Sequence, residues 1–265
     1  MRALAHPFDS FMKTILYPGP RAPESHAQMH LICFPHAGGN AHTYQVWARF
    51  LPASIGVWAY QAAGRGARAK EPAANRLSDL VDEIVLAIDR LPPKPMAFYG
   101  HSFGGFLAFQ VMLRMRDSGR RLPELFVASA SLPPPLVSAN RSRWDGIASD
   151  QAMFDALVQM GGVSPELQPH AQAFLPMMPS VRAEYRFLTE YHHTKEDPLP
   201  VSLVLLSGLR DTLVPPESME GWGRLFVGSP EIRTVQGGHF YVESCVEAVC
   251  AHLSELLARS PEAMA

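Results

Sequence analysis

The chain has 265 residues, 47% of them hydrophobic and 18% charged, which is typical of a globular protein and argues against a disordered one. Its formal net charge of −2 gives no basic footprint for nucleic acid, and no apolar run reaches the roughly 18 residues of a membrane-spanning helix. The three scattered cysteines, Cys33, Cys245 and Cys250, form neither a disulfide framework nor a metal-ligand pattern, so we expect a cytoplasmic protein without a metal.

Residues 1–28 carry no signal-peptide pattern and predict an irregular segment with one short strand. From residue 30 onward, short apolar runs alternate with amphipathic helical patterns. Helices are predicted over 77–91, from about 103 to Gly119, and over 246–257. Strands are predicted at 30–34, 57–60, 96–99, 125–128, 201–206 and 232–235. This alternation predicts an α/β fold, with a mostly parallel central sheet and helices on both faces.

The segment of about 140–198 breaks this alternation, because several helical patterns follow one another without a clear strand. Asp150 is a candidate N-cap for one helix, which Gly161 and Gly162 would end. We therefore predict a single domain over residues 1–265 with a helical lid inserted at 140–198. The methionines and aromatic residues of this segment suit a flexible apolar lid, although each one singly also suits a subdomain that packs its own core.

A nucleophile motif is the strongest chemical signal in the chain. Gly100–Gly105 reads G-H-S-F-G-G, and it contains G-x-S-x-G between a predicted strand and a predicted helix. A strand-to-helix corner of this kind lifts the Ser102 hydroxyl clear of the sheet, and its glycines avoid collisions with neighbouring backbone. It also directs the first amides of the helix, where negative charge is favoured, at the reaction centre. We predict Ser102 as a nucleophile.

A serine hydroxyl needs a base, and the base needs an orienting acid, in the chain order Ser, acid, His for this type of motif. Asp211 lies in the loop after the strand at 201–206, and His239 lies in the loop after the last strand. Both positions fit, and we predict Asp211 and His239 as the other two members of a triad. The rival acids Asp145, Glu217 and Glu243 fit less well in position or in order.

An acyl-transfer site also needs donors for the developing oxyanion. The amide of Phe103, directly after the nucleophile, is one candidate. The second is expected from the loop after an early strand, here F-P-H-A-G-G at Phe34–Gly39. Gly38 and Gly39 allow close approach of the backbone, so we assign the second donor to the amide of Ala37.

With these motifs, Gly237–Phe240 included, the chain resembles the stand-alone type II thioesterases of nonribosomal peptide and polyketide synthases, which belong to the α/β-hydrolase superfamily. The resemblance covers about residues 25–255, and the pair of glycine-rich motifs is more specific than G-x-S-x-G alone. Gly64–Arg68 resembles a further turn motif of the family, and Gly161–Gly162 and Arg182–Glu184 resemble its lid motifs. The chain departs from the family at Ala63, where proline is usual, at Glu184, where aspartate is common, and in the run 129–133.

The resemblance implies an α/β-hydrolase fold with a helical lid and hydrolysis of acyl thioesters from the phosphopantetheine arm of carrier domains. The implied role is editing, which clears misprimed synthases. No cofactor is implied beyond the phosphopantetheine that the substrate carries. The expected partners are acyl or peptidyl carrier domains, bound transiently by a monomer, with neither nucleic acid nor membrane.

Other functions stay open at this point. A product-releasing thioesterase or a small-molecule carboxylesterase of the same fold would use the same triad, and a binding protein could keep the fold without catalysis. The arginines near the end of the predicted helix from 103 suit either an acidic carrier domain or the ordinary preference for cations at a helix C-terminus. These arginines are Arg114, Arg116, Arg120 and Arg121.

Overall fold

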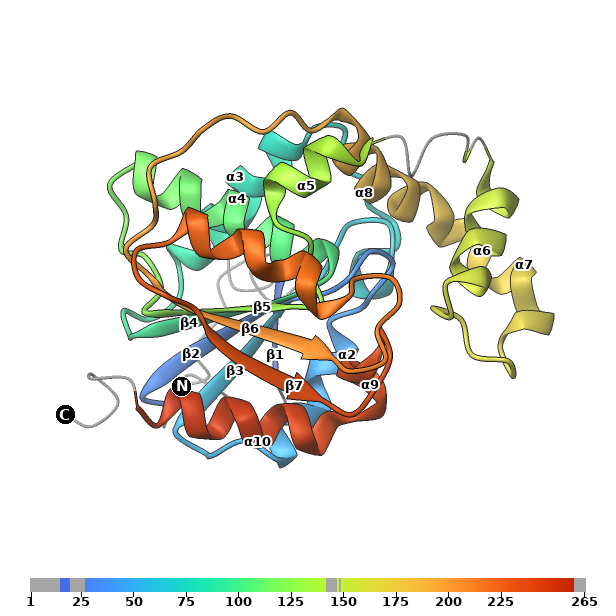
Figure 1. The fold of residues 1–265 in the computed structure, drawn as a ribbon. Helices are drawn as coiled ribbons and strands as arrows, with labels where there is room; N and C mark the ends of the chain where they lie inside the picture. The colour runs from blue at the N-terminus through green and yellow to red at the C-terminus, as the bar shows by residue number, and fades with distance from the viewer. Residues whose placement is uncertain (1–14, 20–26, 142–146, 148, 260–265) are drawn as a thin grey trace, which may run out of the picture.

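The structure, a computed structural model, describes residues 15–19, 27–141, 147 and 149–259. Its centre is a seven-stranded sheet with the strand order β1-β3-β2-β4-β5-β6-β7 (Figure 1). Strand β1 runs antiparallel to β3, and the other five strand pairs are parallel. The strands are β1 (Leu16–Pro18), β2 (Met29–Phe34), β3 (Ile55–Tyr60), β4 (Met96–His101), β5 (Leu125–Ser129), β6 (Ser202–Gly208) and β7 (Glu231–Val235). The predicted α/β class with a mostly parallel sheet is confirmed.

Helices cover both faces of the sheet, which explains why its central strands are apolar throughout. The helices α3 (Leu77–Ile88) and α4 (Phe103–Asp117) pack with the 3₁₀ segment η6 (Pro216–Leu225) over one core. On the opposite face, a second core contains residues of α2 (His42–Gln45), α9 (Tyr241–Ser244) and α10 (Val246–Leu257). Figure 1 shows α3 and α4 above the sheet and α10 below it.

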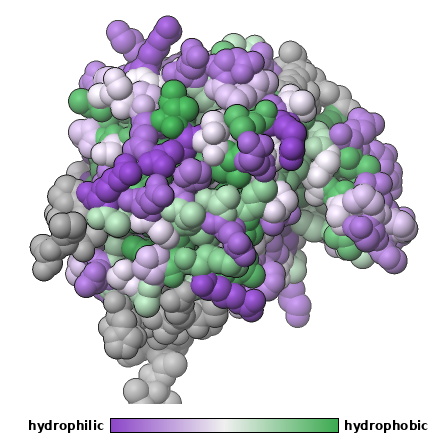
Figure 2. All heavy atoms as spheres, turned by 60° about the horizontal axis from the view of Figure 1, so that its bottom comes forward, coloured by the Kyte–Doolittle hydropathy of each residue, from purple (hydrophilic) through white to green (hydrophobic). Residues whose placement is uncertain are grey.

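The segment between β5 and β6 is helical, as predicted, and lies at the ends of the strands from which the motif loops emerge. Figure 1 shows α6 and α7 projecting from the body, and the same lobe stands out at the right in Figure 2. Helix α8 returns from this lobe to the core. The elements are α5 (Pro134–Ala139), α6 (Asp150–Gln159), η4 (Gln168–His170), α7 (Ala171–Phe174), η5 (Leu175–Met177) and α8 (Met178–Glu190). The assignment of one domain with an inserted lid stays a prediction.

One predicted cap is wrong by a residue. The side chain of Ser149 caps α6 by accepting a hydrogen bond from the amide of Ala152 (3.1 Å), whereas Asp150 is the first helical residue and pairs with Arg182 of α8 (2.9 Å). The end of α6 is as predicted, because Gly161 takes a left-handed φ of 76° just beyond it. Within the described ranges, no helix has both the length and the apolar character needed to cross a bilayer.

Candidate active site

Ser102 sits at a strained corner between β4 and α4. Its φ of 54° and ψ of −119° are unusual for a residue with a side chain. The corner is fixed on both sides, because the Ser102 amide donates to the Ser129 carbonyl (2.8 Å) and the Ser131 hydroxyl donates to the Ser102 carbonyl (2.7 Å). Strain that the surroundings hold in place is typical of a functional position.

The glycines around Ser102 are needed for close packing of backbone. A Cβ on Gly104 would lie 2.5 Å from the carbonyl carbon of Phe34, at the end of β2. A Cβ on Gly100 would lie 2.5 Å from the Cα of Gly105. These contacts are shorter than any that real side chains tolerate, so only glycine lets α4 start directly against the end of β2. The sequence interpretation of this motif therefore has a direct steric basis.

The structure brings the three predicted polar side chains together in one chain of hydrogen bonds. His239 Nε2 lies 3.0 Å from Ser102 Oγ, and His239 Nδ1 lies 2.8 Å from Asp211 Oδ2. The Asp211 side chain is fully buried, and its Oδ1 accepts hydrogen bonds from the amides of Leu213 and Val214, both at 2.9 Å. The carboxylate is thus fixed by three donors, which leaves the imidazole with one preferred orientation.

The rival acids lie elsewhere. Glu243 contacts His36 Nε2 and the Thr43 hydroxyl, both at 3.4 Å, and lies at the edge of the site. Glu217 lies in η6 and has no contact with His239 among the described residues. Asp145 lies outside the described residues.

The two residues whose amides are predicted as oxyanion donors line one cavity with Ser102. Phe103 begins α4, and Ala37 lies in the loop after β2; both residues line the cavity that also holds Ser102 and His239. In the part of the chain that the structure describes, neither amide donates to another group of the protein. Two such donors beside a nucleophile can stabilise negative charge on a bound carbonyl oxygen.

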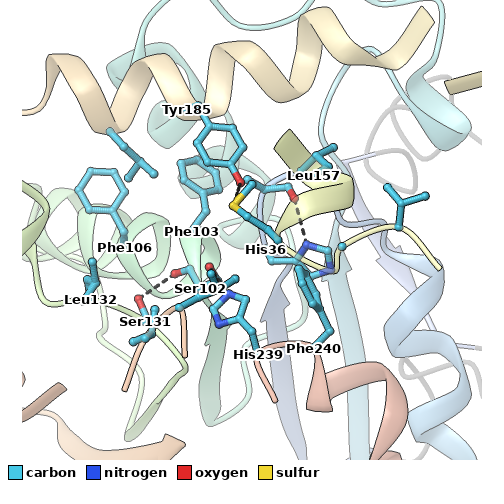
Figure 3. Close-up of a pocket in the computed structure, with 18 of the residues that line it drawn as sticks. His36, Ser102, Phe103, Phe106, Ser131, Leu132, Leu157, Tyr185, His239 and Phe240 are labelled. Atoms are coloured by element: carbon cyan, nitrogen blue, oxygen red, sulfur yellow. Dashed lines mark hydrogen bonds between the residues drawn. The ribbon is translucent and has the colours of Figure 1, made fainter. Parts of the chain in front are cut away.

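The cavity extends from Ser102 into an apolar chamber beneath the lid. Figure 3 shows the rings of Phe103, Phe106 and Tyr185 on the side of Ser102 away from His239. The lid contributes to the lining from α6 and the residue after it, and from α7, η5 and α8; these residues include Phe154, Met160, Phe174, Met177 and Met178. Met153 and Leu175 of the same segment are absent from the described lining. The chamber suits an acyl group better than a charged one.

His101, next to the nucleophile in the sequence, contacts the backbone of His239. Its ring is fully buried, with Nδ1 2.8 Å from the Ser129 hydroxyl and Nε2 2.9 Å from the carbonyl oxygen of His239. Burial, and secondarily the neighbouring His239 and His36, lower the pKa of His101 well below its usual value. A neutral ring therefore helps to hold the loop that carries His239.

Sequence reasoning missed a buried ion pair beside the site. Arg65, in the loop after β3, pairs with Glu184 of α8 at 2.6 Å, and both side chains are almost completely buried. The two residues belong to motifs that the family resemblance singled out, but 119 positions separate them in the chain. No periodicity in either segment indicates that they meet.

The arginine cluster at the end of α4 is occupied by acidic partners within the protein. Arg116 pairs with Glu196 and Arg120 with Asp89, both at 2.8 Å, while Arg114 pairs with Asp82. These contacts favour the structural interpretation of the cluster over a carrier-domain contact. Among the described residues, no group of three or more His, Cys, Asp or Glu side chains could hold a metal ion; the expectation that no cofactor takes part stays a prediction.

Comparison with known proteins gives consistent matches along most of the chain. A family model described as "Thioesterase domain" matches residues 29–257. "Thioesterase TesA" of Mycobacterium leprae is 32% identical over 223 residues, which are 83% of this chain and 84% of that protein. The "Probable cadicidin biosynthesis thioesterase" of Streptomyces griseus is 31% identical over 228 residues, which are 86% of this chain but only 62% of that protein.

A solved structure extends the likeness to the fold. The type II thioesterase BorB from the borrelidin biosynthetic cluster superposes with a TM-score of 0.79 at 27% identity. The match covers 92% of this chain and 98% of that one. Because the match covers most of both chains, it includes the lid segment as well as the sheet.

Proposed function

The chain belongs to the thioesterase-domain family and is an acyl-thioester hydrolase; we propose that Ser102, His239 and Asp211 carry out this hydrolysis on acyl groups held by the phosphopantetheine arm of carrier domains. The observation that carries the proposal is the continuous chain from Ser102 Oγ through the His239 ring to Asp211 Oδ2, at 3.0 and 2.8 Å. The chain ends in a cavity whose far part is apolar.

The first half of the reaction transfers the acyl group to the protein. His239 Nε2 takes the proton of the Ser102 hydroxyl as its oxygen attacks the thioester carbonyl. The amides of Ala37 and Phe103 donate to the oxyanion, and Asp211 stabilises the imidazolium that forms. The thiol leaves when the carbonyl re-forms, taking the proton from His239. A thiol, with an ordinary pKa of about 8.5, is a much better leaving group than an amine.

The second half returns the enzyme to its starting state. Water replaces the thiol beside His239, which takes a proton from the water as its oxygen attacks the Ser102 ester. The same two amides hold the second oxyanion. His239 then protonates Ser102 Oγ, and the free carboxylic acid leaves. Every proton moves through His239 Nε2, so no metal or organic cofactor of the protein is needed for the proposed route.

We assign the biological role to editing of nonribosomal peptide or polyketide synthases, with the carrier domain as a transient partner of a monomeric enzyme in the cytoplasm. The similarity to a type II thioesterase of a biosynthetic cluster supports this role. Three free cysteines among the described residues support a reducing compartment. The mixed lining of Met and aromatic side chains supports acceptance of varied acyl groups, since methionine adapts to different shapes.

A panel of acylated carrier domains tests the proposal. The purified protein is incubated with acetyl-, octanoyl- and aminoacyl-carrier domains, and the released acid is measured, with Ser102→Ala as the control. The proposal predicts release from several carriers that depends on Ser102. Oxygen esters hydrolysed far better than every thioester would point instead to a carboxylesterase, and release of a single full-length product would point to a dedicated product-releasing enzyme.

A further inference from the structure

A buried ion pair joins the body of the protein to the lid helix α8. The side chains of Arg65 and Glu184 are only 3% and 5% exposed, and Arg65 Nη2 lies 2.6 Å from Glu184 Oε1. Arg65 Nη1 also donates to the hydroxyl of Ser180, one turn earlier in α8, at 2.8 Å. Burial of two charges is costly unless both are paired and hydrogen-bonded, so this arrangement tolerates little change.

The same two side chains hold the loop that carries Ala37. The amide of Gly38 donates to Glu184 Oε2 at 2.9 Å, and Arg65 Nε donates to the carbonyl of Gly39 at 2.7 Å. Gly38 has a left-handed φ of 78°. Gly38 and Gly39, directly after Ala37, are therefore held by Glu184 of the lid helix α8 and by Arg65 of the loop after β3. These contacts set where the Ala37 amide lies.

Helix α8 also forms part of the chamber. Met178, Tyr185 and Leu188 line it, while Ser180 and Glu184 of the same helix contact Arg65. This single 13-residue helix thus lines the space for the acyl group and also supplies Glu184, which helps to hold the loop that carries Ala37. Because a helix moves as a rigid element, an acyl group that packs against the chamber side of α8 also affects the position of Ser180 and Glu184 on the same helix.

We propose that Arg65 and Glu184 are positioning residues that couple occupation of the acyl chamber to the placement of the Ala37 amide. This inference rests on the proposed function, because it needs the Ala37 amide as an oxyanion donor. Acyl chains long enough to contact α8 then increase kcat and not only binding, since part of their binding energy appears in the transition state. A short acyl group has fewer atoms to place against α8 and gains a smaller increase.

Three variants test the coupling with two substrates, the acetyl and octanoyl thioesters of N-acetylcysteamine. Glu184→Gln removes the charge that pairs with Arg65, and Glu184→Asp keeps it. Glu83→Gln is the matched control, because Glu83 pairs with another buried arginine, Arg68, and among the described residues neither side chain hydrogen-bonds to the Ala37 loop. Removal of one oxyanion donor lowers kcat by roughly 100- to 1000-fold, so a displaced donor is expected to cost about 10- to 100-fold.

Glu184→Gln is expected to lower kcat for the octanoyl thioester by about 10- to 100-fold, with KM within about 3-fold, and to reduce the octanoyl-to-acetyl ratio of kcat by about 10-fold. Glu184→Asp keeps the charge but shortens the side chain by one methylene, so its kcat is expected to lie between those of the wild type and of Glu184→Gln. Glu83→Gln lowers the melting temperature and leaves the ratio unchanged. A Glu184→Gln variant that melts lower but keeps the wild-type ratio would overturn the coupling.

A double variant covers the case in which Glu184→Gln does not fold. Arg65→Met with Glu184→Met removes both buried charges together, which costs less than leaving one of them unpaired, while Gly38 and Gly39 lose their side-chain hydrogen bonds. The double variant is expected to fold with a reduced octanoyl-to-acetyl ratio, and a wild-type ratio would overturn the proposal. If the wild-type protein shows no Ser102-dependent hydrolysis, the proposed function fails as well, whereas an active wild type with unchanged ratios in the variants removes the coupling alone.

Discussion

The setting of Asp211 makes the result of replacing it by asparagine predictable. Its Oδ1 accepts two backbone hydrogen bonds, from Leu213 and Val214, and its Oδ2 faces His239 Nδ1 at 2.8 Å. An amide NH₂ group cannot accept from backbone N–H donors, so the asparagine oxygen takes the place of Oδ1. The NH₂ group then donates to His239 Nδ1 and forces the ring proton onto Nε2, where it blocks acceptance of the proton of Ser102.

The expected loss in kcat for Asp211→Asn is about 10³- to 10⁴-fold, by analogy with the same change in serine proteases. This corresponds to about 4 to 5.5 kcal/mol of transition-state stabilisation, at about 1.36 kcal/mol for each factor of ten. The variant has nearly the same shape and keeps both backbone hydrogen bonds, so its melting temperature is expected to stay within a few degrees of the wild type.

Thiol release from octanoyl-N-acetylcysteamine, followed continuously at saturating substrate, measures this loss. Glu217→Gln is the control, because it removes a rival carboxylate that has no described contact with His239 and should leave kcat unchanged. A kcat for Asp211→Asn within 10-fold of the wild type would refute the assigned orientation, as would an equal loss in the Glu217 variant.

Two further predictions concern the packing and the titration of the site. Gly104→Ala places a Cβ 2.6 Å from the carbonyl oxygen of Pro35, so α4 must move; the melting temperature is expected to fall, and kcat to fall by at least about 100-fold. Gly223→Ala is the control, because the nearest atom to its Cβ lies at 3.4 Å, and it should change neither quantity. A fully active Gly104→Ala variant would contradict this packing argument. Burial lowers the pKa of His101 in the folded protein, so as the pH falls below about 6.5 the unfolded chain takes up a proton on this ring before the folded chain does, and stability is lost. The urea midpoint of unfolding should therefore be lower at pH 5.5 than at pH 7.5, and the difference should be smaller in His101→Gln. Equal midpoints at both pH values in the wild type would be inconsistent with a buried neutral ring.

Local pattern was enough to predict the sheet and the position of the site. The apolar runs at 30–34, 96–99 and 201–206 each became a parallel strand, because a strand covered on both faces must be apolar on both sides. Parallel strands place their carboxyl ends at one edge, so loops after three strands bring Ser102, Asp211 and His239 together. The resemblance to type II thioesterases, based on two glycine-rich motifs, is confirmed by the family match.

Contacts between distant segments were beyond such reasoning. Glu184 appeared only as a departure from a family motif, and its pairing with Arg65 depends on how the lid folds back onto the body. The role of His101 was also missed, since nothing in G-H-S-F-G-G indicates that its ring bonds to the carbonyl of His239. In both cases the partner lies more than 100 residues away, where no local periodicity applies.

The central claim is that the Ser102 oxygen carries the acyl group between the carrier domain and water. Rapid mixing of the protein with octanoyl-carrier domain, acid quenching and mass analysis of the digested protein measure this directly. We predict a transient gain of one octanoyl group on the peptide that contains Ser102, and no such gain in Ser102→Ala. Steady hydrolysis with the acyl group on another side chain, or undiminished hydrolysis by the Ser102→Ala variant, would contradict the account.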